Sequence, residues 1–236
     1  MSPSPFWTGA RDALALPAWV VGLSMLGIGS LAREVGHPAA AAVLSTFLIW
    51  ASPAQLILYG GLAAGTALPA IALAILLSSI RFLPMTITLL ALLRRPGQGP
   101  AVQLLAAHYV SVTVWVENLR RLPPKPPEER LPYYFGFANT TICVSALLTG
   151  VGFYLAGAVP PLVAGALLFL APLYFTVSIV AGARSVTDWT AAAFGLVAAP
   201  IFANVFGPDL DLLAVGLVGG SVAYFVGRRR RALGAG

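Results

Sequence analysis

Charged residues are scarce in this chain: Asp, Glu, Lys and Arg make up 9% of its 236 residues, against about 25% in a soluble domain. Hydrophobic residues make up 58%, and the mean hydropathy is +0.87. A soluble fold built from this chain would lack the charge needed to cover its surface. The composition therefore excludes a soluble protein and predicts an integral membrane protein.

Period-two alternation is also lacking, because the apolar runs are long and continuous. A helical span needs about 20 apolar residues to cross about 30 Å of hydrocarbon. Runs of this length predict an all-α, polytopic transmembrane bundle of about seven full spans, within a range of six to eight. The apolar runs cover residues 14–32, 39–62, 66–93, 133–159, 162–182, 189–206 and 210–226.

Residues for metal and covalent chemistry are few. Cys143 is the single cysteine, which excludes an intrachain disulfide and a cysteine metal site. His37 and His108 have no further ligands nearby in the sequence, whereas a zinc site needs three or four. The Walker, G-x-S-x-G and H-E-x-x-H patterns are absent. We therefore expect no metal site, no cofactor and no enzymatic activity.

The basic residues cluster between the apolar runs and near the C-terminus, giving a formal charge of +6. On a membrane protein such clusters are topology signals facing anionic lipid, so we expect a bilayer and no nucleic acid as partner. They place the proline-rich loop 120–132 and the C-terminus in the cytoplasm. If segment 101–119 crossed fully, Arg94 and Arg95 would lie outside, so we expect an irregular polar segment there. The whole chain, 1–236, is expected to form one transport domain.

Arg81 is the one charged residue of the apolar run 66–93. A charge near the bilayer centre costs about 2.5–3.5 kcal/mol on insertion scales, so it is expected to have a function. Pro84 removes a backbone donor three residues later, which predicts a discontinuous helix. A cation beside a broken helix suits a midplane site for a carboxylate. The alternative is a buried ion pair, with Glu117 as partner.

A second proline-interrupted run contains the stretch WASPAQL, residues 50–56. Pro53 predicts a discontinuity, and a buried amide at Gln55 needs partners or a ligand. Two such segments are the best sequence pointer to a transporter site. The predicted substrate-binding residues are Arg81, Gln55, Ser52, Ser79 and Asn139. Hydroxyls within spans also bond to their own helix, which is the alternative for the stretch around Asn139.

Glu117 lies near the end of the polar segment 101–119, whereas the other acids lie in loops or near the ends of apolar runs. A carboxylate at this depth is a candidate proton-coupling group. The alternative is an ordinary residue at the membrane–water boundary.

Two stretches resemble a known family, the AzlC-type large subunit of bacterial branched-chain amino acid exporters. They are GIGSLAREVGHPAAAAVLSTFLIWASPAQL, residues 27–56, and SSIRF, residues 78–82. Gln55 and Arg81 match the family pattern, and the length, span layout and basic loop fit nearly the whole chain. Ser52 departs from a glycine, Ser79 from Asn or Asp, and Phe82 from His. The stretch 111–113 departs most, because both acids of the family's Thr-Asp-Glu are missing.

The resemblance implies a secondary, ion-driven exporter of valine, leucine, isoleucine or other neutral amino acids in the cytoplasmic membrane of a bacterium. It also implies a small AzlD-like membrane subunit as partner. Two alternatives stay open. One is a permease for another small organic solute, such as an organic acid, which the missing acids favour. The other is a membrane assembly subunit that transports nothing itself.

Overall fold

The computed structural model describes residues 4–156, 185–206 and 211–233, together with isolated residues between 160 and 183. All regular secondary structure in these ranges is helical, as the sequence predicts. The apolar run 162–182 lies almost entirely outside the described residues. The helices are α1 Pro5–Ala15, α2 Pro17–Glu34, α3 Ala39–Ile49, α4 Ser52–Ala63, α5 Leu68–Ser79, α6 Phe82–Leu93, α7 Pro100–His108, α8 Val112–Arg121, α9 Pro127–Leu155, α11 Val186–Phe206 and α12 Asp211–Leu233.

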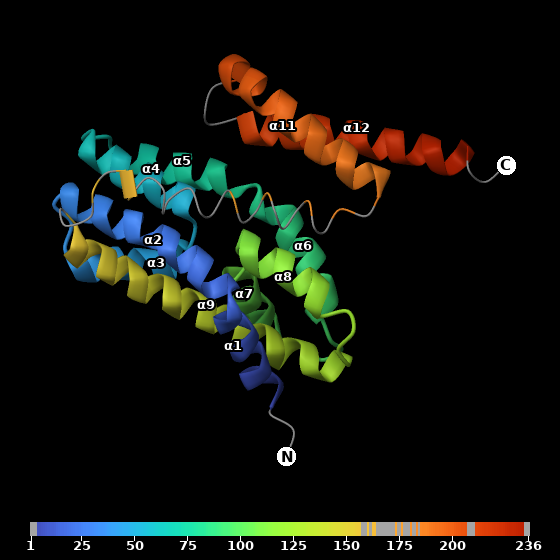
Figure 1. Cartoon of the computed structure of the whole chain (residues 1–236), viewed down its shortest axis with the longest axis horizontal. Helices are drawn as coiled ribbons and strands as arrows, with labels where there is room; N and C mark the ends of the chain where they lie inside the picture. The colour runs from blue at the N-terminus through green and yellow to red at the C-terminus, as the bar shows by residue number, and fades with distance from the viewer. Residues whose placement is uncertain are drawn as a thin grey trace.

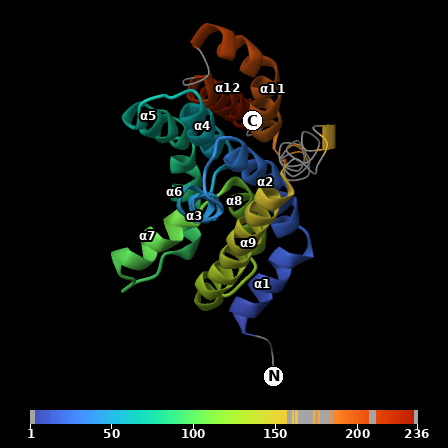
Figure 2. The same ribbon diagram turned by 90° about the vertical axis from the view of Figure 1, so that its left-hand side faces the viewer.

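Helix α9 is the central element, and α1 and α2 pack along it (Figures 1 and 2). Glycines make this contact possible. A Cβ atom on Gly29 of α2 would overlap the carbonyl oxygen of Thr149, and one on Gly152 of α9 would overlap that of Leu26. The two backbones therefore touch directly, which is how small residues hold membrane helices together.

The described helices differ in how far each could span a membrane. By length and composition, α9 alone is long and apolar enough to cross. The pairs α1–α2 and α5–α6 would each make a further span if counted as one, although they bend by 56° and 52°. The described part therefore holds up to three candidate spans by this criterion, and the count of seven stays a prediction.

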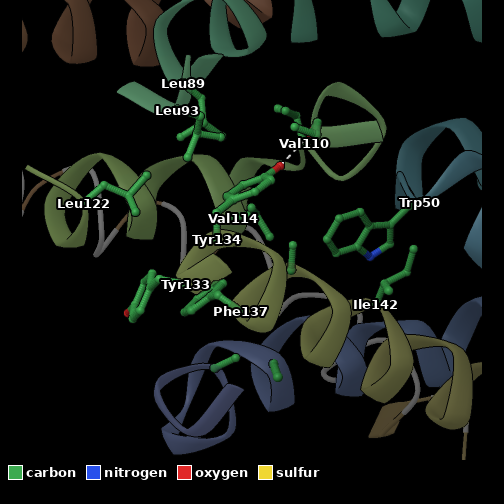
Figure 3. Packing of buried hydrophobic residues seen from close by; sticks show 14 of the residues in the cluster. Trp50, Leu89, Leu93, Val110, Val114, Leu122, Tyr133, Tyr134, Phe137 and Ile142 are labelled. Carbon is green, nitrogen blue, oxygen red and sulfur yellow. Dashed lines mark hydrogen bonds between the residues drawn. The ribbon is translucent and has the colours of Figure 1, made fainter. Parts of the chain in front are cut away.

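Aromatic side chains of α9 form the centre of the larger buried cluster (Figure 3). Tyr133, Tyr134 and Phe137 are fully buried and pack with Leu89 of α6 and Val114 of α8. The Tyr134 hydroxyl donates to the carbonyl of Ala106 in α7 at 2.7 Å. A buried phenol needs such a partner, so this bond fixes α7 against α9.

The structure makes the predicted charged loop shorter, and it gives one of two glycine spacings a packing role. The link between α8 and α9 covers only residues 122–126, because both helices reach into the charged segment 120–132. The sequence contains two G-x-x-x-G spacings, Gly61–Gly65 and Gly216–Gly220. Gly61 faces Ile71 of α5, whereas a Cβ on Gly216 or Gly220 would meet no atom of the described residues within 4 Å. The first glycine therefore serves packing of α4 on α5 within this chain.

Candidate binding site at three helix breaks

Between residues 39 and 121 the chain forms three pairs of short helices, and a short break separates the two helices of each pair. Helix α3 ends before Trp50, whose φ of 37° is left-handed, and α4 begins at Ser52. Helix α5 gives way to α6 at Ile80 and Arg81, and α7 gives way to α8 across residues 109–111. The short helices therefore expose free backbone groups inside the fold.

The prolines lie just after two of these breaks instead of at them. Pro53 is the second residue of α4, and Pro84 is the third residue of α6. Backbone N–H groups in the first turn of a helix have no acceptor within that helix. Proline therefore fits there without losing a hydrogen bond. At the third break Ser111 caps α8, accepting from the backbone N–H of Val114 at 3.4 Å.

A cavity of about 430 Å³ lies where the three breaks meet. The N-cap residues of α4, α6 and α8 are Ala51, Arg81 and Ser111, and all three line it. The remaining lining residues are Val21, Ser24, Met25, Trp50, Ser52, Pro53, Leu56, Phe82, Val112 and Thr113. The wall is therefore mostly apolar, with hydroxyl groups and one cation.

Arg81 has no ion-pair partner among the described residues. Its Nε atom is buried without a hydrogen bond, and its guanidinium lies 5.2 Å from the ring centre of Phe82. The alternative of an ion pair with Glu117 is wrong, because Glu117 bonds to Arg121 instead. A cation that the described protein leaves unpaired in a cavity is suited to an external anion.

Ser52 and Gln55 both lie in α4 but face different surroundings. Ser52 lines the cavity and its hydroxyl approaches the Met25 sulfur at 3.8 Å. Gln55 lies outside the lining and is fully buried. Its amide nitrogen donates to Ser45 and Thr46 at 3.0 Å each, which ties α4 to α3. Gln55 therefore holds the first break together.

Ser79 and Asn139 also lie outside the cavity lining. The Ser79 hydroxyl donates to the carbonyl of Ile75 at 2.7 Å, within its own helix. The Asn139 side chain accepts from the Tyr109 hydroxyl at 2.8 Å. Because Tyr109 belongs to the third break, Asn139 anchors that break to α9.

The first and third breaks also support each other. The rings of Trp50 and Tyr109 meet edge to face, with centroids 6.3 Å apart. His108 Nε2 lies 2.9 Å from the Phe47 carbonyl oxygen, near the end of α3. These contacts join α3 to α7 on one side of the cavity.

Glu117 lies in α8 but outside the cavity lining. It is buried, and its carboxylate accepts from Arg121 Nε at 2.8 Å. Arg121 also pairs with Asp12 at 3.2 Å, and Asp12 accepts from the Tyr133 hydroxyl at 2.6 Å. This network joins α1, α8 and α9. It therefore fixes α8, the helix whose first residues form one wall of the cavity.

Several cavity residues escaped the sequence-based prediction, among them Trp50, Ser111 and Thr113. Trp50 Nε1 and Thr113 Oγ1 are buried and have no hydrogen-bond partner among the described residues, on side chains with 3% and 1% exposure. A signal for two of them was present, since the stretch 111–113 aligns with the acidic triplet of the resembled family. Trp50 had no comparable signal, because its position depends on a left-handed backbone.

The helical fold, its apolar candidate spans and the cavity at discontinuous helices define a membrane protein of the transporter class. The sequence comparison agrees with this class. The family model described as AzlC protein matches residues 17–159, so the chain belongs to the AzlC family. Every residue that lines the cavity falls within the matched range. No curated protein and no solved structure gives a significant match.

Proposed function

We propose that this chain is a secondary transporter that exports branched-chain or other small apolar amino acids, with the substrate carboxylate held at Arg81. The observation that carries the proposal is an arginine that no described residue pairs with, in a largely apolar cavity where three helix breaks meet. Family membership supports the same class of solute.

The helix ends around the cavity supply complementary partial charges. The N-termini of α4 and α8 carry partial positive charge beside the cavity and favour a carboxylate. The C-terminal end of α3 adjoins Trp50 and carries partial negative charge, which favours an ammonium group. Val21, Met25 and Leu56 offer an apolar surface for the side chain. Gln55, Ser79 and Asn139 act as positioning residues behind this surface.

The proposed setting is the cytoplasmic membrane of a bacterium, with about seven spans and a small AzlD-like subunit as partner. In this setting the loop 120–132 and the C-terminus face the cytoplasm. Short segments rich in Lys and Arg favour that side of the membrane, and four arginines, Arg228 to Arg231, lie near the C-terminus.

Efflux from vesicles tests the proposal. Vesicles that contain the purified chain, with and without a small subunit, are loaded with labelled leucine and diluted. We expect leucine to leave faster than from protein-free vesicles. A chain that moves neither leucine, valine nor another solute in either preparation would be an assembly subunit, which contradicts the proposal.

Glu117 is the candidate for proton coupling. Replacing Glu117 with Gln removes the titratable group and keeps the shape of the side chain. We expect an imposed pH gradient to stop accelerating leucine efflux in Glu117→Gln, whereas the rate without a gradient persists. Leucine efflux and internal pH are recorded together in the same vesicles. A full response to the gradient in this variant would show that another group couples transport.

A further inference from the structure

We propose that Thr113 is a second ligand of the substrate carboxylate, so that the first turn of α8 and Arg81 bind this group together. The inference rests on the proposed function, because it concerns the same cavity and the same zwitterionic class of solute. It assigns a binding role to a residue of the third helix break, where the proposed function names only the helix end.

The Thr113 hydroxyl has no use within the described protein. The residue lines the cavity and is 1% exposed, and its Oγ1 atom has no hydrogen-bond partner among the described residues. Hydroxyls inside helices usually bond to a carbonyl one turn earlier, as those of Thr141 and Thr149 do at 2.8 and 2.9 Å. Thr113 is the second residue of α8, so its helix has no earlier turn to supply that carbonyl. An oxygen of a bound ligand can supply the missing partner, and a buried hydroxyl without one is costly.

The first turn of α8 is also a suitable place for an anion. Unlike α4 and α6, this helix has no proline in its first turn to remove a backbone donor. The Ser111 side chain accepts from the N–H of Val114, whereas the N–H groups of Val112 and Thr113 have no acceptor within the helix. A helix N-terminus carries about half a positive charge and commonly binds anions. A carboxylate can therefore bind backbone donors and the Thr113 hydroxyl at the same place.

The C-terminal ends of α3, α5 and α7 carry the opposite partial charge and meet the same breaks. No residue of these three helices is among the described lining residues. At the third break, the carbonyls of Ala106 and Ala107 accept from the Tyr134 hydroxyl at 2.7 Å and the Val110 N–H at 3.1 Å, so the protein itself partly satisfies the end of α7. The end of α3 adjoins Trp50, which does line the cavity. The ammonium group is therefore expected at the end of α3, away from the start of α8.

Arg81 and Thr113 come from neighbouring helices. Trp115 Nε1 of α8 donates to Thr88 Oγ1 of α6 at 2.9 Å, and the two helices lie side by side (Figure 1). Arg81 immediately precedes α6, Thr113 lies in the first turn of α8, and both line the same cavity. A carboxylate has two oxygens, so it can accept from a guanidinium and a hydroxyl at once. Hydrogen bonds to a charged group are stronger than neutral ones, which makes the contribution of Thr113 measurable.

Thr113→Val removes the hydroxyl and keeps a similar shape. Equilibrium dialysis of labelled leucine against the purified full chain in detergent measures affinity, and the thermal midpoint is recorded without leucine. We expect leucine to bind at least about tenfold more weakly, because a hydrogen bond to a charged group is lost. The midpoint is expected to stay the same or rise, since the variant removes a buried polar atom that no described residue pairs with. A fall in affinity together with a lower midpoint would indicate a structural role and overturn the inference.

Two further variants serve as controls. Thr113→Ser keeps the hydroxyl and is expected to bind leucine within about threefold of the wild-type affinity. Thr141→Val removes a fully buried hydroxyl of α9 that lies outside the lining and donates to the Phe137 carbonyl. It is expected to lower the midpoint and leave the leucine affinity unchanged. Undiminished leucine binding in Thr113→Val would overturn this inference alone, whereas a wild type that binds no leucine would overturn the proposed function as well.

Leucinamide identifies the group of the ligand that Thr113 binds. It keeps the ammonium group and side chain of leucine but carries a neutral amide in place of the carboxylate. Its affinity is measured by competition with labelled leucine. Because the lost bond is stronger to a charged acceptor, the preference for leucine over leucinamide is expected to fall at least about threefold in Thr113→Val. An unchanged preference would place Thr113 at another group of the ligand and overturn the inference.

Discussion

Arg81→Ala is expected to lower efflux of leucine, whose carboxylate is proposed to bind this arginine, by at least about 30-fold. Truncating a charge that binds an opposite charge costs about 2 kcal/mol or more. Fold stability is expected to be unchanged or higher. Arg81 makes no ion pair with the described residues, and its Nε atom is buried without a partner. The variant removes an uncompensated cation from the interior. Transport and the thermal midpoint are measured on the same preparation.

Two comparisons sharpen this experiment. Arg81→Lys keeps the charge but loses the planar fork, so an intermediate rate is expected. Arg33→Ala is the matched control, since Arg33 donates to the carbonyls of Phe153 and Tyr154 at 3.2 and 3.3 Å and lies outside the cavity lining. It is expected to lower stability and to leave the rate per folded molecule unchanged. Undiminished efflux in Arg81→Ala would remove the anchoring role.

Gly152→Leu is expected to have the largest effect on stability. Even a Cβ atom at position 152 would overlap the carbonyl oxygen of Leu26, which is backbone and cannot turn away. Overpacking a core typically costs about 1–3 kcal/mol, and a clash with backbone is expected to reach or exceed the upper value. Helices α2 and α9 would have to separate, so the detergent-purified variant is expected to aggregate or unfold at a much lower temperature.

Gly60→Leu provides the control for a glycine in a helix. Gly60 lies in α4, and a Cβ there would meet no atom of the described part of the chain within 4 Å. Leucine also favours helix more than glycine does. An unchanged or higher midpoint is therefore expected for Gly60→Leu. A similar drop in both variants would show that the close approach of α2 and α9 does not account for the loss.

Much of the site was predictable because its ingredients are anomalies in an apolar sequence. Arg81 and Pro84 stand out in a run where charge and proline are costly, and Pro53 marks a second interrupted run. Ser52 and Arg81 do line the cavity, as a shared site would require. Gln55 and Asn139 are polar for another reason: their amides hold helix breaks in place, and sequence does not tell these two roles apart.

The sequence by itself determined the helical membrane class, since its composition leaves no other way to satisfy the backbone and cover the surface. It also determined the family, whose pattern runs through residues 17–159. Tertiary structure decided which partners each polar group has. Glu117 pairs with Arg121 and not with Arg81, and Trp50 reaches the cavity through a left-handed turn. Pairings between distant segments depend on how α3, α5 and α7 end against one another, and periodicity along the chain contains no information on that.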